Sequence, residues 1–193
     1  MWIGGSPCAG KSTVAARLAA TRGAPLYTCD DHWDEHTALA TARGIPVLAK
    51  LRALPVERRL RQPPEVQVAD VVEAYREEFV FILKELSDGP VVVEGAALLP
   101  ELLGAIGVAA DRAVWLVPTE GFQRVHYSNR DWAQDLLAGF TDAEALFEVW
   151  MQRDAAFARL VARQAGDFGY HVVTVDSQRS AEDVFAEVVA TLR

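Results

Sequence analysis

The sequence is poor in cysteine and lacks any long apolar segment. Among 193 residues there are only two cysteines, Cys8 and Cys29, which are too few for a disulfide scaffold. No apolar run approaches the roughly 18 residues that indicate a transmembrane helix. Only four residues precede the first motif, so the sequence as given offers no secretory signal peptide. We therefore expect a cytoplasmic protein with one hydrophobic core, a single domain over residues 1–193.

Positive charge is also scarce. Lysine and arginine together number 19 against 27 aspartates and glutamates, and the net charge is -8. This balance argues against nucleic acid or an anionic membrane as a partner. Only three of the basic residues are lysines, and the other 16 are arginines. A protein of this kind that binds a polyanion must collect its positive charge at one place, so the arginines are candidates for a binding site.

The segment near the N-terminus is the strongest functional signal. It reads Gly5-Ser6-Pro7-Cys8-Ala9-Gly10-Lys11-Ser12-Thr13 and matches G-x-x-x-x-G-K-[ST], the phosphate-binding P-loop. Its glycines let backbone N–H groups turn toward phosphate oxygens, and the helix that begins near Gly10 points its positive end at them. Lys11 would contact the β- and γ-phosphates of ATP and act in catalysis, and the Ser12 hydroxyl would bind Mg²⁺. The sequence thus predicts ATP and Mg²⁺ as cofactors.

Hydrophobic periodicity predicts alternating strands and helices. We expect strands over residues 1–3, 25–29, 91–93, 113–117 and 170–175. We expect helices over 10–22, 63–86, 98–106, 120–137, 141–164 and 183–192, with several short ones between 33 and 61. Capping boxes at 141–144 and 180–183 mark the starts of the last two helices. This order predicts an α/β fold with a five-stranded parallel sheet and helices on both faces, a three-layer α/β/α arrangement.

Acidic residues follow two of the predicted strands. Asp30 and Asp31 come after the second strand, and Glu94 ends the third. In parallel sheets the ligand binds beyond the carboxyl ends of the strands, so these side chains are site candidates. An aspartate could take the proton of an alcohol acceptor, and Glu94 could hold Mg²⁺ through water or contact the acceptor. The sequence leaves open which of the three acids is the base, with Asp30 as the first choice.

Arginines lie on both sides of a glycine-containing turn. Phosphoryl transfer needs cations around the transferred group, and Arg124, Arg130 and Arg153 are the candidates. We expect Arg124 and Arg130 to bind the nucleotide, and Arg130 and Arg153 to act in catalysis. The alternative for each of the three arginines is a solvent-exposed helix position without a functional role. Aromatic side chains either wall an acceptor pocket or belong to the core: Trp33, Trp132 and Trp150.

The histidines are not expected to bind a metal. His32, His36 and His126 have no matching set of cysteines and histidines around them in the sequence. Mg²⁺, the ion that the P-loop predicts, prefers oxygen ligands.

With these residues placed, the chain resembles the small P-loop kinases. This group includes nucleoside monophosphate kinases, shikimate and gluconate kinases, and antibiotic phosphotransferases of the chloramphenicol type. Besides the P-loop and the order of elements, two segments look like the arginine segments around the family's LID, Gln123-Arg124-Val125-His126-Tyr127-Ser128-Asn129-Arg130 and Gln152-Arg153-Asp154. The resemblance implies the sheet order 2-3-1-4-5, a LID over about residues 130–141 and an acceptor-side helical segment over about 33–88. The LID is short, as in shikimate kinases, and no Asp-Gly-Phe-Pro-Arg stretch of the adenylate kinase type follows the third strand.

These observations predict an ATP-dependent phosphotransferase that moves the γ-phosphate of Mg-ATP to a hydroxyl of a small molecule. Its partners would be ATP and that acceptor, and the protein would be a monomer or a homodimer. One alternative takes a nucleoside or a nucleoside monophosphate as the acceptor. Another is a nucleotide-binding switch protein with little catalysis, although the sequence has no Asn-Lys-x-Asp guanine signature. Because the first predicted strand is short, a natural N-terminus upstream of Met1 stays open.

Overall fold

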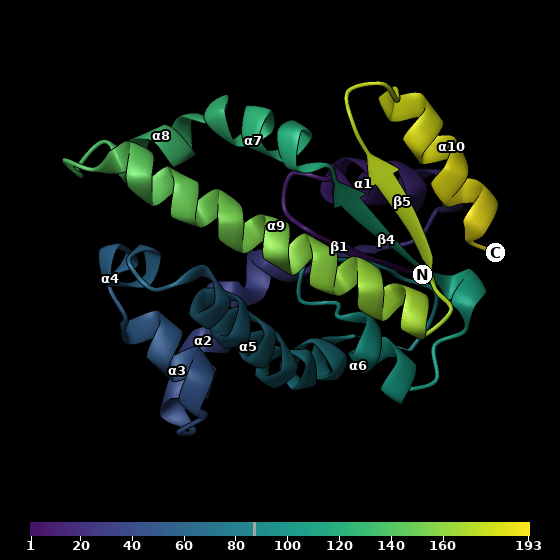
Figure 1. Cartoon of the computed structure of the whole chain (residues 1–193). Helices are drawn as coiled ribbons and strands as arrows, with labels where there is room; N and C mark the ends of the chain where they lie inside the picture. The colour runs from purple at the N-terminus through teal and green to yellow at the C-terminus, as the bar shows by residue number, and fades with distance from the viewer. Residues whose placement is uncertain (87) are drawn as a thin grey trace.

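The computed structural model describes residues 1–86 and 88–193 and contains a five-stranded parallel sheet (Figure 1). The strands lie in the order β2-β3-β1-β4-β5, and each neighbouring pair is parallel. They are β1 (Trp2–Gly5), β2 (Leu26–Thr28), β3 (Val92–Glu94), β4 (Ala113–Pro118) and β5 (His171–Val175). The predicted fold class and the order 2-3-1-4-5 are confirmed.

The register of the sheet brings the ends of three strands to one edge. Ile3 of β1 lies opposite Glu94 of β3 and Val114 of β4. Thr28, the last residue of β2, also lies opposite Glu94. The chain therefore leaves β1, β2 and β3 at nearly the same level, which is where ligands bind in parallel α/β sheets.

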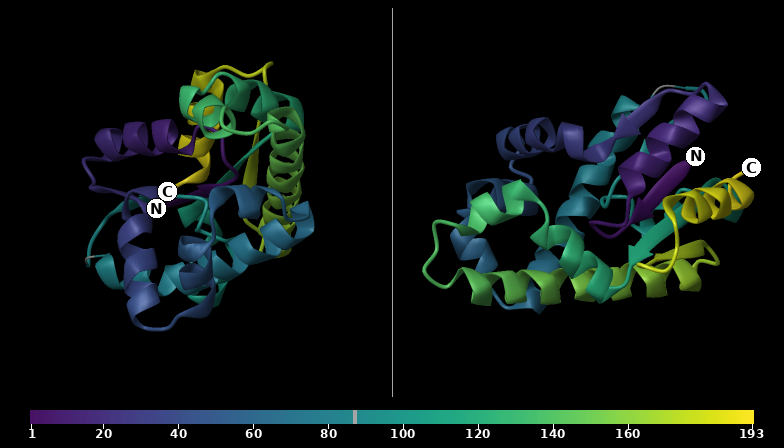
Figure 2. Two further views of the ribbon diagram at one scale, coloured as in Figure 1. Left: turned by 90° about the vertical axis from the view of Figure 1, so that its left-hand side faces the viewer. Right: turned by 90° about the horizontal axis from the view of Figure 1, so that it is seen from above.

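Helices cover both faces of the sheet because its strands are apolar on both sides. Val92 and Val114 face one layer, whereas their neighbours Val93 and Trp115 face the other. The first layer contains α1 (Lys11–Arg22) and α10 (Ala181–Thr191), and the second contains α5 (Pro64–Glu85), α6 (Pro100–Ala105) and α9 (Ala143–Asp167) (Figure 2). A 3-10 turn over Ala110–Arg112 precedes β4. In the described ranges, no helix combines the length and apolarity that a membrane crossing requires.

Three short helices follow β2, as expected for residues 33–61. They are α2 (Cys29–Ala42), α3 (Pro46–Ala53) and α4 (Val56–Leu60). Ala40 of α2 and Leu48 of α3 pack against Phe81 of α5 in a small cluster of their own. Residue 87, inside the predicted acceptor-side segment 33–88, lies outside the described residues.

The second strand is shorter than predicted. The expectation of a strand over 25–29 is wrong at its end, because α2 already begins at Cys29. The Cys29 side chain is buried against Gly95, where a Cβ would come within 2.5 Å of the Cys29 Cβ. Asp30 and Asp31 therefore lie in the first turn of a helix, where the helix dipole favours acidic residues.

The LID region also differs from the prediction. The continuous helix expected over 120–137 is two helices, α7 (Glu120–Ser128) and α8 (Asp131–Leu137). Arg130 has extended backbone angles between them, and Gln134 Nε2 donates to the carbonyl oxygen of Ser128 at 2.6 Å. The break lets aromatic rings from both helices meet Trp150 of α9. Figure 1 places α8 and α4 at the same end of the molecule, opposite the two termini.

One of the two expected capping boxes forms. Ser180 and Asp183 cap α10 reciprocally, as predicted. At α9 the N-cap is Asp142, without a side-chain cap, so the box expected at 141–144 is wrong. The Asp142 carboxylate instead accepts hydrogen bonds from Arg61 at 2.6 and 2.9 Å, which draws it away from its own helix.

Candidate active site

The P-loop joins β1 to α1 and requires glycine at its first position. Gly5 has φ +130°, and a Cβ there would lie 2.0 Å from the carbonyl oxygen of Leu116. Gly10 is the N-cap of α1 with φ +77°, and no side chain caps the first N–H groups of the helix. An exposed helix N-terminus of this kind attracts an anion. The loop therefore suits a phosphate group.

Lys11 lies folded over the loop. It is 9% exposed, and its Nζ donates to the carbonyl oxygen of Ser6 at 3.0 Å. Burial lowers the pKa of Lys11, and the carboxylates of Glu94 and Asp30 oppose this effect. A cation held against a neutral carbonyl would gain from an anion placed in the loop.

Gln123 of α7 supports the P-loop through side-chain hydrogen bonds. This buried side chain of α7 donates through Nε2 to the Ser6 hydroxyl at 3.1 Å and to the Pro7 carbonyl at 2.9 Å. From the sequence, Gln123 was noted only as the first residue of an arginine-containing segment. Only the packing of α7 against the loop reveals its role as a positioning residue.

Glu94 and Ser12 provide two oxygen ligands beside Lys11. Glu94 is 2% exposed at the end of β3. Burial raises the pKa of Glu94, while the Lys11 ammonium and a hydrogen bond with Ser12 lower it. A carboxylate and a hydroxyl are the hard oxygen donors that Mg²⁺ prefers, so these residues fit that ion.

A cavity of about 330 Å³ opens on the α1 and α10 side of the P-loop. Residues 8–10 and Thr13 line it together with Arg130 and Arg179. The Arg17 guanidinium lies 3.9 Å from the centroid of the Phe185 ring at its rim and forms two hydrogen bonds with Glu182. Apolar walls near a cationic edge suit a nucleotide base and its phosphates. We call this space the nucleotide cavity.

A second cavity of about 390 Å³ opens on the opposite side of the loop. Pro7 and Asp30 line it where it meets the P-loop. Aromatic side chains form much of the remaining wall: Trp33, Tyr75, Tyr127, Trp132, Trp150 and Phe157. The sequence left the three tryptophans open between pocket and core, and the structure places them in this wall. We call this space the acceptor cavity.

Two arginines bring positive charge into the acceptor cavity. Arg153 pairs with Asp154 at 2.6 Å. Arg59 of α4 has no ion-pair partner within residues 1–86 and 88–193, and its Nε is buried without a hydrogen-bond partner there. Burial and the nearby charge of Arg153 lower the pKa of Arg59. No motif distinguishes Arg59 from the other arginines of its segment.

The other predicted site residues divide between the two cavities and the surface. Asp30 and Asp31 are both exposed, and only Asp30 is part of the lining of the acceptor cavity. Arg130 reaches the nucleotide cavity. Arg124 turns outward to Glu148 at 2.8 Å and lines neither cavity among the described residues.

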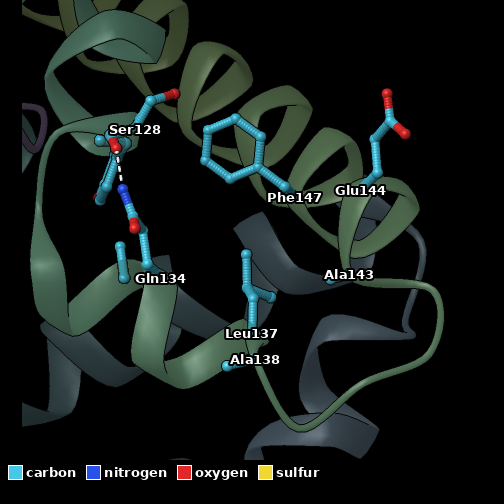
Figure 3. Close-up of a pocket in the computed structure, with 9 residues that line it drawn as sticks. Ser128, Gln134, Leu137, Ala138, Ala143, Glu144 and Phe147 are labelled. Carbon is cyan, nitrogen blue, oxygen red and sulfur yellow. Dashed lines mark hydrogen bonds between the residues drawn. The ribbon is translucent and has the colours of Figure 1, made fainter.

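A further cavity of about 360 Å³ lies between α7, α8 and α9 (Figure 3). Apolar side chains such as Leu137 and Phe147 line it, and Glu144 is the charged residue in its wall. A lining of this kind is unsuited to a phosphorylated ligand. We interpret this space as a gap between the helices α7, α8 and α9.

Comparisons with known proteins agree with this geometry at the level of the fold. Neither a family model nor a curated protein matches the sequence. A shikimate kinase from Bacteroides thetaiotaomicron is 14% identical, over 98% of this chain and 93% of that chain, with a TM-score of 0.52. A shikimate kinase from Acinetobacter baumannii, solved in complex with shikimate, is 15% identical, over 98% and 89%, with a TM-score of 0.51.

A gluconokinase from Sinorhizobium meliloti 1021 is 18% identical, over 98% and 89% of the two chains, with a TM-score of 0.46, too low to bear on the argument. At these identities the two shikimate kinases show the fold alone. The chain has the fold of the small P-loop kinases.

Proposed function

We propose that this protein is an ATP-dependent kinase that phosphorylates a hydroxyl group of a small anionic molecule. The observation that carries the proposal is the position of the P-loop between two cavities. Residues 8–10 line the nucleotide cavity, and Pro7 lines the acceptor cavity. A phosphoryl group held by the loop would therefore lie within reach of both.

On the nucleotide side, the chain would bind the phosphates through the N–H groups of residues 8–13 and the Lys11 ammonium. Glu94 and Ser12 would hold Mg²⁺, which neutralises phosphate charge when bound. Arg130 would contact the nucleotide from the LID. Its charge lowers the pKa of Cys8 against the effect of burial, which supports a position near the loop.

On the acceptor side, Asp30 would act as the general base. Its carboxylate oxygen would accept the proton of the acceptor hydroxyl as the hydroxyl oxygen bonds to the γ-phosphorus, and the bond from that phosphorus to the bridging oxygen would break and release ADP. Asp30 also influences the pKa of Lys11, which supports a position near the transferred group. Asp31, which is exposed like Asp30, has no comparable place in the cavity wall.

The charge of the cavity supports an anionic acceptor. Two guanidinium groups face the same space, and one of them has no carboxylate partner in the described ranges. Leaving a half-buried cation unpaired is costly, and a carboxylate of the ligand would remove that cost. The aromatic walls favour a compact molecule with a flat or ring-shaped body.

A nucleoside monophosphate is the second candidate acceptor. The aromatic walls could stack against a base, and the two arginines could hold its phosphate. A phosphate acceptor is already ionised and needs no general base. The effect of removing the Asp30 carboxylate therefore separates the two candidates.

The test is ADP release with Mg-ATP against a panel of hydroxylated carboxylic acids, nucleosides, nucleoside monophosphates, neutral sugars and hydroxyl-bearing antibiotics, with Lys11→Ala as the blank. Acceleration by a hydroxy acid, and little by its methyl ester, is the expected result. Acceleration by a nucleoside monophosphate alone would favour the second candidate. Tight ATP binding without turnover, together with a large conformational response to the γ-phosphate, would instead indicate a switch protein.

A further inference from the structure

Two histidines and a glutamate converge beside the acceptor cavity. His32 and His36 are four residues apart on α2, so they project from the same face of that helix. His32 Nδ1 lies 3.1 Å from Glu85 Oε2, and His36 Nε2 lies 3.1 Å from Glu85 Oε1. One donor atom from each residue lies within 4.8 Å of the other two.

These separations fit one small metal ion. Zinc bonds of about 2.0–2.2 Å in tetrahedral geometry place neighbouring donor atoms about 3.3–3.5 Å apart. The two histidine-to-carboxylate distances are each within a few tenths of an ångström of that spacing, and they end on different oxygens of Glu85. The carboxylate would therefore bind through both oxygens or turn to bind through one. His32 and Glu85 are about one-third exposed, with 36% and 30% of their side chains accessible, so a water molecule can complete the coordination.

The ring of His36 is held as a metal ligand would be. Its Nδ1 lies 3.1 Å from Glu78 Oε1, and both side chains are buried. The tautomer that donates Nδ1–H to Glu78 leaves a lone pair on Nε2, and that lone pair faces the Glu85 carboxylate. In that tautomer, a cation between the two acceptors would stabilise both of them. Nε2 is buried 3.1 Å from Glu85 Oε1 and has no well-aligned hydrogen bond within the described residues.

Other neighbours fix the remaining two ligands. The Tyr27 hydroxyl donates to Glu85 Oε2 at 2.6 Å, and the Tyr27 ring stacks on His32 with centroids 4.4 Å apart. Hydrogen-bonded partners behind the ligands are typical of metal centres, because they orient the donor atoms. From the sequence we expected no metal at these histidines. Their third partner, Glu85, lies about 50 residues away, and only the packing of α2 on α5 brings it near.

We propose that His32, His36 and Glu85 bind a divalent transition-metal ion of the zinc type, with solvent as the fourth ligand. Imidazole nitrogens suit zinc, cobalt and nickel, whereas Mg²⁺ prefers oxygen, so this site is separate from the one at Ser12 and Glu94. The ion fastens α2 to the end of α5. Because α2 also carries Asp30 and Trp33, the site braces one wall of the acceptor cavity.

The test is titration of the untagged full chain with Zn²⁺ by calorimetry, and with Co²⁺ by visible absorption. We expect one ion per chain, the intense visible bands of four-coordinate Co²⁺, and a rise in Tm with Zn²⁺. A tenfold excess of Mg²⁺ should not displace the ion. Lys11→Ala should bind Zn²⁺ like the wild type, so the result does not depend on the proposed kinase activity.

Variants distinguish binding at this site from nonspecific binding of Zn²⁺ elsewhere on the protein. His32→Ala and Glu85→Gln should each weaken Zn²⁺ binding by more than about 100-fold, and Glu78→Gln by about 10–100-fold. His171→Ala is the matched control, since it removes another histidine that lies 2.7 Å from a glutamate, Glu187, and should leave binding unchanged. His32 and Glu85 are partly exposed, so their variants should fold, which circular dichroism checks. If the wild type binds no more tightly than His32→Ala, or if His171→Ala weakens binding equally, the proposal is wrong.

Discussion

The two cavities beside the P-loop are built in different ways. The phosphate end of the nucleotide cavity comes from one continuous segment, residues 8–10 and Thr13. The acceptor cavity combines Asp30 of α2, Arg59 of α4 and Arg153 of α9, which are far apart in the sequence. A site made by local backbone conformation can be recognised as a motif. A site made by packing between distant helices cannot.

The largest expected effect is on the nucleotide side. Lys11→Ala should lower kcat/KM by about 10³-fold, because a buried cation at the transferred phosphate has no replacement. Steady-state kinetics measures the loss, and thermal unfolding provides the control. The Tm should not fall, since Lys11 makes a single hydrogen bond to a loop carbonyl. Retained turnover would contradict the assignment of the P-loop.

The next effect tests the acceptor side. Asp30→Asn should reduce kcat by about 10²-fold and leave the KM for ATP nearly unchanged, because it removes a base and no nucleotide contact. Asp31→Asn is the matched control, with a change of less than about twofold. An equal loss in both variants would mean that the acids stabilise the start of α2 instead.

A third experiment examines the charge of the acceptor cavity. Arg59→Met should raise the KM for an anionic acceptor by about 10–100-fold, which is the value of one charged hydrogen bond. The same change should raise the Tm of the free protein, because it removes a cation that lacks an ion-pair partner in the described part of the chain. Arg58→Met, at the exposed neighbouring position, should change neither quantity. A lower Tm without any change in KM would show that Arg59 only supports the fold.

The smallest expected difference lies between Arg124 of α7 and Arg130, which follows that helix. Arg130→Ala should lower kcat by about tenfold, because its guanidinium lies in the nucleotide cavity. Arg124→Ala should change kcat by less than about twofold, since Arg124 forms an exposed ion pair with Glu148. Comparison of the two rates under saturating ATP decides the point. Equal losses of kcat would indicate that α7 moves enough to bring Arg124 into the nucleotide cavity.

The fold was predictable because its signals are local. The P-loop motif, the short apolar strands and the 3–4 periodicity of α5 each lie within one stretch of sequence, and together they gave the α/β class. The errors came at boundaries that packing decides. Cys29 begins α2 because it packs on Gly95, and Asp142 caps α9 without its side chain because Arg61 binds its carboxylate.

The sequence by itself determined the P-loop, since Gly5 and Gly10 act through the backbone conformation of one short segment and Lys11 follows directly after it. Only the tertiary structure decided which acid enters the acceptor cavity, that Arg59 joins Arg153, and that Glu85 meets His32 and His36. The physical reason is that side chains on separate helices acquire their neighbours, burial and charge environment only when those helices pack. No spacing in the chain encodes such contacts directly.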